Sequence, residues 1–367
     1  MNNKTNIKKI AILTGGGDCP GLNAVIRAVT KTAINVYGWE VVGFRNGYKG
    51  LYNNDWIKLD NNSVSGLLHR GGTMLYSSNK DNLFHYLVEE NEEMVYKDVS
   101  DVGVDNINNL GIDIMFIVGG DGTLTSARDF ARKGVNVIAI PKTIDNDLAS
   151  TDTTFGFSTA VNVATEALDR LHTTAQSHHR IMVLEVMGRY AGWIALHAGI
   201  AGGADVILLP EIPYDILKVA GKIEERKQYG KDFSIVVVGE GAKPIDGEVV
   251  VRDIVLDSPD PIRLGGIGIK VARDLEKICG NETRATILGH LQRGGSPSAS
   301  DRILSTRYGV AAVRLAAEAK FGNMVTLRGD TMSYDSLENV IGRKSKLVNP
   351  TGELVEAARA IGVSFGN

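Results

Sequence analysis

Two glycine-rich stretches, each following an apolar run, contain the residues that could bind phosphate. Residues 114–118 are apolar, and the stretch 119–123 (GGDGT) follows them before a helix-like segment over 124–132. Glycines let the backbone approach an anion, and the unpaired N–H groups of a helix N-terminus point at it. The carboxylate of Asp121 is favourable there mainly if a divalent cation lies between it and the anion. The stretch predicts a site for phosphate and a metal ion.

A second stretch has the same form. Residues 9–13 predict a buried strand, residues 14–21 (TGGGDCPG) a turn, and residues 22–36 a helix with apolar positions at helical spacing. One such turn could be structural. Two turns that reach the same sheet edge suggest a single long ligand bearing several phosphates.

A third stretch offers a general base. The strand expected over 135–140 leads into residues 141–147 (PKTIDND). These polar residues could form an Asx-type turn, or a base and substrate contact at the carboxyl end of a parallel sheet. In the second reading Asp145 accepts a proton from a substrate hydroxyl, while Thr143 and Asp147 orient the substrate or the metal. Together with the glycine turns, this combination fits phosphoryl transfer.

Basic side chains near the expected strand ends would suit a second substrate that carries phosphate. Any one of them is more often a solvated or ion-paired residue, but several in a chain of net charge -3 indicate a local anion site. They are Arg70, Lys142, Arg180, Arg189, Arg284, His290 and Arg293.

Strand-like and helix-like segments alternate along the chain, which predicts an α/β protein with mostly parallel sheets. Residues 81–102 are ambiguous and could be partly helical. The tail after residue 320 alternates short elements and carries no pattern of chemical interest. Further helices are expected over 157–174, 212–228, 264–279 and 301–320, and further strands over 41–44, 180–186, 205–210, 233–238 and 283–291.

Composition excludes several other classes of protein. The 367 residues are 43% hydrophobic and 23% charged, which is ordinary for a globular protein. The net charge of -3 argues against nucleic acid or a membrane surface as partner. We see no run of 18 apolar residues and no signal-peptide core. Two cysteines without metal-binding spacing suit a reducing compartment, so we expect a cytoplasmic protein.

Four stretches together resemble the phosphofructokinase family. They are 119–123, 141–147, 187–189 (MGR) and 289–295 (GHLQRGG), and the similarity extends from about residue 9 to about residue 322. The resemblance implies two similar αβα lobes, with fructose 6-phosphate in the cleft between them. We expect a donor-side lobe over 1–150, a sugar-phosphate lobe over 151–320, and a C-terminal segment over 321–367 that packs back on the lobes.

The resemblance also implies roles for individual residues. The family's reaction is the phosphorylation of fructose 6-phosphate to fructose 1,6-bisphosphate in glycolysis. Asp145 would be the base that accepts the proton of the sugar's 1-hydroxyl, and Asp121 would be the acid beside Mg²⁺. Catalysis would also use Thr143, Lys142 and Arg189. The donor phosphates would lie against Gly17, Gly120, Asp121, Gly122, Thr123 and Lys80. The sugar phosphate would contact Thr143, Asp145, Asp147, Met187, Gly188, Arg189, Glu240, His290 and Arg293.

Arg180 and Arg284 match positions that reach the 6-phosphate bound by a neighbouring subunit. The resemblance therefore implies a homo-oligomer, commonly a tetramer, although a dimer remains open. Asp205 and Arg27 resemble residues of a regulatory site between subunits, but His172 stands where an Arg is usual. The resemblance therefore does not indicate which allosteric effectors, if any, bind between the subunits.

Two positions indicate different phosphoryl donors. Gly122 resembles the ATP-using members, whereas members that use pyrophosphate carry Asp, whose bulk and charge would obstruct the α-phosphate of a nucleotide. Lys142 resembles the pyrophosphate-using members. A lysine can hold a phosphate without excluding ATP, so we favour ATP, with a pyrophosphate-dependent phosphotransferase as the alternative. The direction of flux in the cell depends on this choice.

Two other functions share part of this pattern. NAD and lipid kinases also carry a GGDGT-type turn, but they lack stretches like 141–147 and 290–295. A non-catalytic sugar-phosphate sensor is suggested only by Asn79, because many relatives have an Arg there to bridge the transferring phosphate. Either Lys80 or Lys142 could supply that charge. A sensor needs neither a base nor a metal-binding acid, so the presence of Asp121 and Asp145 favours an enzyme.

Overall fold

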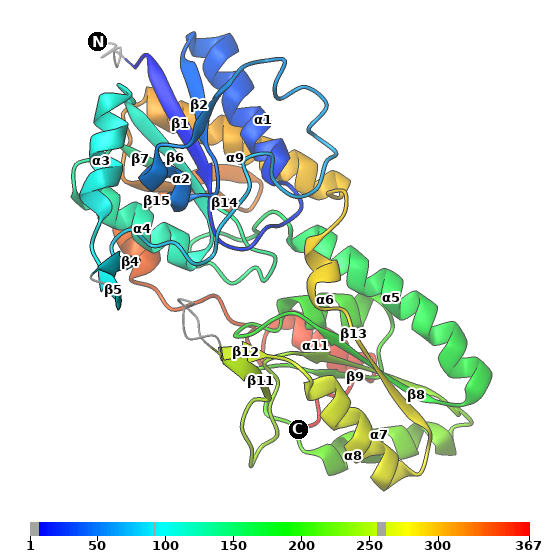
Figure 1. Cartoon of the computed structure of the whole chain (residues 1–367). Coiled ribbons are helices and arrows are strands. Elements are labelled where there is room, and N and C mark those ends of the chain that lie inside the picture. Colours follow the sequence, from blue (N-terminus) through cyan, green and yellow to red (C-terminus); the bar gives the residue numbers. More distant parts are fainter. Residues whose placement is uncertain (1–6, 91–92, 255–261) are drawn as a thin grey trace. The chain divides into compact units, whose positions relative to one another are not determined.

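The computed structural model describes residues 7–90, 93–254 and 262–367, and these form two compact units (Figure 1). Unit 1 comprises Met1–Thr143, Leu148–Gly156 and Arg293–Lys344. Unit 2 comprises Ile144–Asp147, Phe157–Gln292 and Ser345–Asn367. The stretch 141–147 thus contributes residues to both units.

Unit 1 is built on a seven-stranded sheet with the order β15-β14-β7-β6-β1-β2-β3. The pairs between β14 and β2 are parallel, while β14–β15 and β2–β3 are antiparallel. The six residues of β6 are all buried, as expected for a strand covered on both faces. The strands are β1 Lys9–Thr14, β2 Glu40–Phe44, β3 Trp56–Leu59, β6 Ile114–Gly119, β7 Val137–Pro141, β14 Asn323–Arg328 and β15 Thr331–Ser336.

Helices cover both faces of this sheet (Figure 1). α3 and α4 share one hydrophobic core with Ala11, Leu13 and Met115 of the strands. α1 packs with α9 on the other face, and α1 continues into a short π-helix, Ala33–Tyr37. The helices of unit 1 are α1 Leu22–Thr32, α2 Tyr48–Asn53, α3 Ser100–Asn109, α4 Asp121–Arg132, α9 Ala299–Ala317 and α10 Leu337–Ile341.

The structure resolves one ambiguous segment of unit 1 and corrects one expected boundary. The ambiguous segment 81–102 contains an antiparallel hairpin, β4 Tyr86–Glu90 and β5 Glu93–Lys97, before α3 begins. Its aromatic and β-branched residues favour strand. Residues 293–320, which were expected in the second lobe, belong to unit 1 because α9 packs closely on α1. A Cβ on Gly309 of α9 would lie 2.7 Å from the Ala28 Cβ and 3.0 Å from the Val25 oxygen.

Unit 2 repeats the design with a four-stranded parallel sheet, order β13-β8-β10-β9. All residues of β8 and β10 are buried. The α7 and α8 helices share a core with one face of these strands, and α5 and α6 pack together on the other face (Figure 1). The strands are β8 Ile181–Val186, β9 Val206–Leu208, β10 Ser234–Gly239, β13 Thr283–Ile287 and the hairpin β11 Val251–Ile254 with β12 Ile262–Leu264. The helices are α5 Phe157–His178, α6 Trp193–Ala201, α7 Ile216–Gln228, α8 Ile267–Cys279, α11 Glu353–Ala360 and the 3-10 helix Gly289–Arg293.

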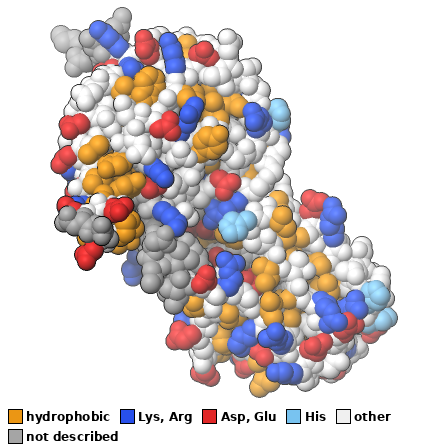
Figure 2. Space-filling view, viewed as in Figure 1, with side chains coloured by type: hydrophobic (Ala, Val, Ile, Leu, Met, Phe, Trp, Pro, Cys, Tyr) orange, Lys and Arg blue, Asp and Glu red, His pale blue; other side chains and the backbone are white. Residues whose placement is uncertain are grey.

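The predicted α/β class with mostly parallel sheets is confirmed. Among the described residues, no helix is long and apolar enough to cross a membrane. The face drawn in Figure 2 carries acidic and basic side chains that are interspersed with each other.

The contact between α1 and α9 generates a stability prediction. We expect Gly309→Ala to lower the free energy of unfolding by about 1–3 kcal/mol, because the added methyl overlaps Ala28. Gly221 in α7 is the matched control: its Cβ would meet nothing within 4 Å. Gly221→Ala should therefore stabilise the helix by about 0.5–1 kcal/mol. Denaturant unfolding at equal protein concentration measures both variants, and a neutral Gly309→Ala would contradict the packing.

Candidate functional site

The two predicted glycine turns lie at one edge of the unit 1 sheet. β1 and β6 are parallel neighbours, with Thr14 opposite Val118, so their carboxyl ends coincide. The Gly15 N–H donates to the Val118 oxygen at 2.9 Å. The strand order reverses here, because β2 lies on one side of β1 and β6 on the other. Ligands of α/β sheets bind at such a switch point.

Thr123 fills the space between the turns. A Cβ on Gly15 would lie 2.8 Å from the Thr123 side chain, and one on Gly119 only 2.3 Å from the Thr123 Cβ. Both positions therefore require glycine for close approach. At Gly122, by contrast, a Cβ would meet nothing within 4 Å. Open space lies beside the second residue of α4.

Asp121 is the first residue of α4, and its side chain is exposed. Desolvation raises the pKa of this carboxyl above its ordinary value, and the positive charge of Arg128 opposes the shift. Within the described ranges, no three His, Cys, Asp or Glu residues are grouped to hold a metal ion. Magnesium sites commonly use one or two carboxylates and complete their shell with substrate phosphates and water. A single carboxylate beside a phosphate turn fits that pattern.

Lys142 brings a positive charge to the glycine turns. Its side chain is buried, with 4% exposed, and Nζ donates to the Gly17 oxygen at 2.5 Å. A Cβ on Gly16 would lie 3.3 Å from Nζ. The backbone N–H of Lys142 donates to the Gly119 oxygen at 2.9 Å, so this one residue contacts both turns.

Arg293 lies beside the first turn, in unit 1. Its NH1 donates to the Asp18 oxygen at 3.2 Å, and a Cβ on Gly17 would lie 2.2 Å from the same nitrogen. Most of the other residues predicted to hold the sugar phosphate belong to unit 2. In this structure, therefore, Arg293 is grouped with the residues predicted to hold the donor.

The loop that carries Lys80 supports the same turn. The Gly16 N–H donates to the Ser78 oxygen at 2.9 Å, and the Ser77 hydroxyl donates to the Gly16 oxygen at 2.5 Å. Lys80 itself is exposed two residues further along the chain. Arg70 precedes this loop, and its carbonyl accepts from the Asn23 side chain at 3.2 Å.

The stretch after β7 alternates between buried and partly exposed residues. Ile144 and Asn146 are buried, at 1% and 5% exposure, while Thr143, Asp145 and Asp147 are partly exposed. Asn146 has a φ of 54°, in the left-handed region. The backbone oxygen of Thr143 accepts from the Thr154 hydroxyl at 2.7 Å. The two buried residues thus fix a turn that leaves the two acids partly exposed, with one carboxylate oxygen of Asp145, Oδ1, buried.

In unit 2, candidate residues follow the carboxyl ends of three neighbouring strands. Met187, Gly188 and Arg189 follow β8, Glu240 follows β10, and His290 follows β13. The backbones approach closely here: a Cβ on Gly241 would lie 1.9 Å from the Arg189 oxygen. The Met187 N–H lies 3.4 Å from the Gln292 side-chain oxygen that accepts it. These strand ends therefore bring the predicted sugar-phosphate residues to one edge of the sheet.

Arg180 and Arg284 lie at the opposite edge of the sheet, at the amino ends of their strands, as the strands expected over 180–186 and 283–291 imply. Arg180 precedes β8, and Arg284 is the second residue of β13. Both pair with Glu282: the distance from Arg180 Nε to the carboxylate is 2.8 Å, and Arg284 NH2 contacts it as well. The guanidinium of Arg180 holds the pKa of Glu282 below its ordinary value.

Lys346 contacts the candidate site and Glu211 supports the segments beside it, although neither residue was singled out from the sequence. Lys346 bonds to Asn146 and Asp147. The Glu211 carboxylate accepts from the Gly192 N–H at 3.0 Å and from the Val348 N–H at 2.8 Å. Neither residue belongs to a glycine-rich or acidic motif, so local patterns give no signal for them. Gln292 lies inside the stretch 289–295, where the motif itself could have indicated it.

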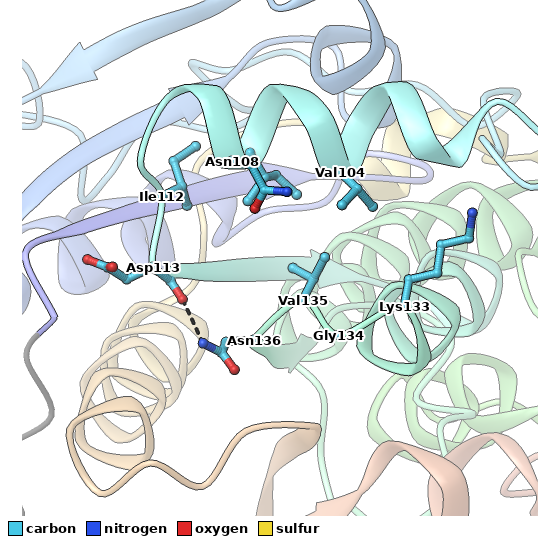
Figure 3. A pocket seen from close by; sticks show the side chains of 9 residues that line it. Val104, Asn108, Ile112, Asp113, Lys133, Gly134, Val135 and Asn136 are labelled. Atoms are coloured by element: carbon cyan, nitrogen blue, oxygen red, sulfur yellow. Dashed lines mark hydrogen bonds between the residues drawn. The ribbon is translucent and has the colours of Figure 1, made fainter.

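A pocket of about 310 Å³ in unit 1 lies elsewhere (Figure 3). It is lined by apolar side chains of α3, together with Asp113, Lys133 and Asn136. The Asp113 carboxylate accepts from the N–H groups of Lys8 and Lys9, and Lys133 pairs with Asp101 at 2.7 Å. Its charged groups thus have protein partners, and no predicted site residue lines it.

The fold and these strand-end groups define an α/β protein built to hold phosphate groups. The family model described as Phosphofructokinase matches residues 9–316. The chain therefore belongs to the phosphofructokinase family.

Individual relatives are similar over nearly the whole chain. "ATP-dependent 6-phosphofructokinase 2" of Clostridium perfringens is 69% identical over 98% of this chain and 99% of that protein. "Pyrophosphate--fructose 6-phosphate 1-phosphotransferase" of Streptomyces coelicolor is 48% identical over 98% of this chain and 100% of that protein. Phosphofructokinase from Saccharomyces cerevisiae has a structure similar to this one, with a TM-score of 0.78 and 30% identity over 91% of this chain and 45% of that chain.

Proposed function

We propose that this chain catalyses the glycolytic transfer of the γ-phosphoryl group of ATP to the 1-hydroxyl of fructose 6-phosphate. The observation that carries the proposal is its 69% identity, over nearly all of both chains, to an ATP-dependent 6-phosphofructokinase. The residues that phosphoryl transfer needs support it: two glycine turns at one sheet edge, a metal-side acid and a base. The products are ADP and fructose 1,6-bisphosphate.

Asp145 is the base in this proposal. It accepts the proton of the 1-hydroxyl as the oxygen attacks the γ-phosphorus, and the bond from phosphorus to the β,γ-bridging oxygen breaks. Lys142 and Arg189 neutralise the charge on the transferring phosphoryl group, with Thr143 orienting the acceptor. Asp121 would hold Mg²⁺, which supplies charge neutralisation on the phosphate oxygens.

The donor phosphates rest on the first residues of α4 and on the turn after β1. Gly17, Gly120, Gly122 and Thr123 offer backbone N–H groups, and Lys80 adds charge from its loop. The sugar phosphate is held by Asp147, Met187, Gly188, Glu240 and His290. Arg293 also belongs to this set by resemblance, and its position beside Gly17 would let it act near the donor.

Gly122 is the position on which the choice of donor depends. The open space beside it leaves room for the α-phosphate of a nucleotide, and an Asp there would fill that room with negative charge. Pyrophosphate remains the second candidate because Lys142 lies against the phosphate turn and because a relative named for pyrophosphate is 48% identical.

An aldolase-coupled assay with fructose 6-phosphate and Mg²⁺ tests the function, with ATP and pyrophosphate compared at equal concentration. We expect turnover with ATP. Turnover with pyrophosphate alone would overturn the choice of ATP and the argument from Gly122. No turnover with either donor would indicate a sugar-phosphate sensor.

Asp145→Ser should abolish most turnover while leaving fructose 6-phosphate bound. Loss of a general base typically costs 10²–10⁴-fold in rate. Calorimetric titration with the sugar phosphate and steady-state kinetics measure the two properties on the same preparation. A variant that retains kcat would exclude Asp145 as the base.

Gly122→Asp should lower activity with ATP without unfolding the protein, because its side chain would enter open space. We expect at least a tenfold loss of kcat/KM for ATP. Gly122→Asn is the matched control, since it adds similar bulk without the charge. Equal losses in both variants would assign the effect to bulk; unchanged ATP kinetics in both would remove Gly122 from the donor site.

We further propose a homo-oligomer, most simply a tetramer, in which Arg180 and Arg284 serve a neighbouring subunit. The six residues of β8 separate Arg180 from Met187. At about 3.3 Å per residue, they span roughly 20 Å, too far for both ends to hold one sugar phosphate. An oligomer removes this difficulty, because Arg180 and Arg284 can then contact the sugar phosphate bound by a neighbouring subunit.

Subunit complementation tests this arrangement. Asp145→Ser and Arg284→Ser should each be nearly inactive alone, and co-expressed hybrids should regain part of the activity. In a hybrid, some sites combine Asp145 of one subunit with Arg284 of another. Hybrids no more active than the separate variants would place both residues in the same subunit's site.

We also propose a cytoplasmic location, as glycolysis requires. Cys19 and Cys279 are not in a disulfide. Burial raises the pKa of Cys19 to about 12, so its thiol is unreactive at neutral pH.

A further inference from the structure

Lys346 contacts the stretch that carries the proposed base, although the tail it belongs to showed no chemical pattern. Its backbone N–H donates to the Asp147 oxygen at 2.7 Å. Its Nζ donates to the Asn146 side-chain oxygen at 3.0 Å. All three residues belong to unit 2. One residue of the C-terminal segment thus bonds to two consecutive residues that follow Asp145.

Asn146 is fixed by this contact. It is buried, it lies between Asp145 and Asp147, and its φ of 54° is in the left-handed region. Asparagine tolerates that region better than most residues other than glycine, and the bond from Lys346 holds its side chain in one orientation. The direction in which Asp145 and Asp147 point depends on the backbone of the residue between them.

Lys346 is itself held from the opposite side. Its carbonyl accepts from the Trp193 indole N–H at 2.8 Å, and its Nζ lies 5.6 Å from the centre of the Trp193 ring. Two residues on, the Val348 N–H donates to Glu211, which also accepts from Gly192. Burial raises the pKa of Glu211 above its ordinary value. The segment is therefore fixed to the turn that follows Met187–Arg189.

We propose that Lys346 is a positioning residue for the reaction: through Asn146 it sets the direction of the Asp145 and Asp147 carboxylates. The inference rests on the proposed function, in which Asp145 is the base. Misplacing a reacting group by about 1 Å can cost 10²-fold in rate. Loss of the Nζ bond should therefore reduce kcat more than it reduces binding of the donor.

Three single variants test the proposal. Lys346→Met removes the Nζ bond but keeps the backbone bonds to Asp147 and Trp193, and we expect kcat to fall tenfold or more with KM for ATP within about twofold. Lys346→Arg restores a cationic donor and should recover most of the loss. Lys344→Met removes a nearby exposed charge and should match the wild type. Thermal unfolding of each variant separates a general loss of stability from a loss of kcat.

A double-mutant cycle identifies the route. Asn146→Gly removes the amide while a left-handed backbone remains allowed. If Lys346 acts through Asn146, this variant alone should lower kcat, and the combination with Lys346→Met should be no worse than the poorer single variant. Multiplicative losses would overturn the route through Asn146.

The outcomes distinguish the two proposals. Wild-type turnover together with full kcat in Lys346→Met overturns the positioning role and leaves the function intact. A wild type that is silent with both donors overturns the function, and the positioning role with it. If Lys346→Met does not fold, Asn146→Gly decides alone, because full kcat in that variant also overturns the proposal.

Discussion

The parallel pairing of β1 with β6 is the constraint on which the rest of unit 1 depends. It brings two glycine turns to one edge of the sheet, with the Thr123 side chain between them. Thr123 lies so close to both turns that neither Gly15 nor Gly119 has room for a Cβ. β7 pairs with β6, so Lys142, the next residue after β7, reaches the same place. A side chain at Gly15 or Gly119 would force the turns apart. The close approach of the two turns therefore follows from the strand order and from glycine at positions 15 and 119.

Unit 2 uses the same constraint for different chemistry. The residues of its strands β8 and β10 are all buried, so the exposed candidate residues of these strands lie beyond their ends. The carboxyl ends carry Arg189, Glu240 and His290, and the amino ends carry Arg180 and Arg284. Glu282 pairs with both arginines, which keeps two like charges close together.

The fold class and most of the candidate site could be predicted from the sequence. An apolar run that ends in glycine or an acidic residue indicates both a buried strand and the end of that strand at which site residues lie. The α/β class and the clustering of 15–17 with 119–123 follow from that rule. The same strand pattern places Arg180 and Arg284 at the amino ends of their strands, but it does not indicate that both pair with Glu282. It also missed Lys346. Contacts between residues 200 apart in the chain leave no local signal, and a left-handed Asn146 cannot be recognised from residue type alone.

The choice of donor depends on local geometry as well as on overall similarity. Close relatives named for ATP and for pyrophosphate both match nearly the full chain, so the fold accommodates either donor. Two side-chain positions differ in what they can do. A buried lysine at 142 attracts any phosphate, whether it belongs to a nucleotide or to pyrophosphate, and so does not discriminate. Residue 122 can discriminate between the donors, because a carboxylate there would repel the α-phosphate of ATP, which pyrophosphate lacks, whereas glycine repels neither donor. Glycine at 122 thus admits a nucleotide, and the 69% identity to an ATP-dependent relative then favours ATP as the donor.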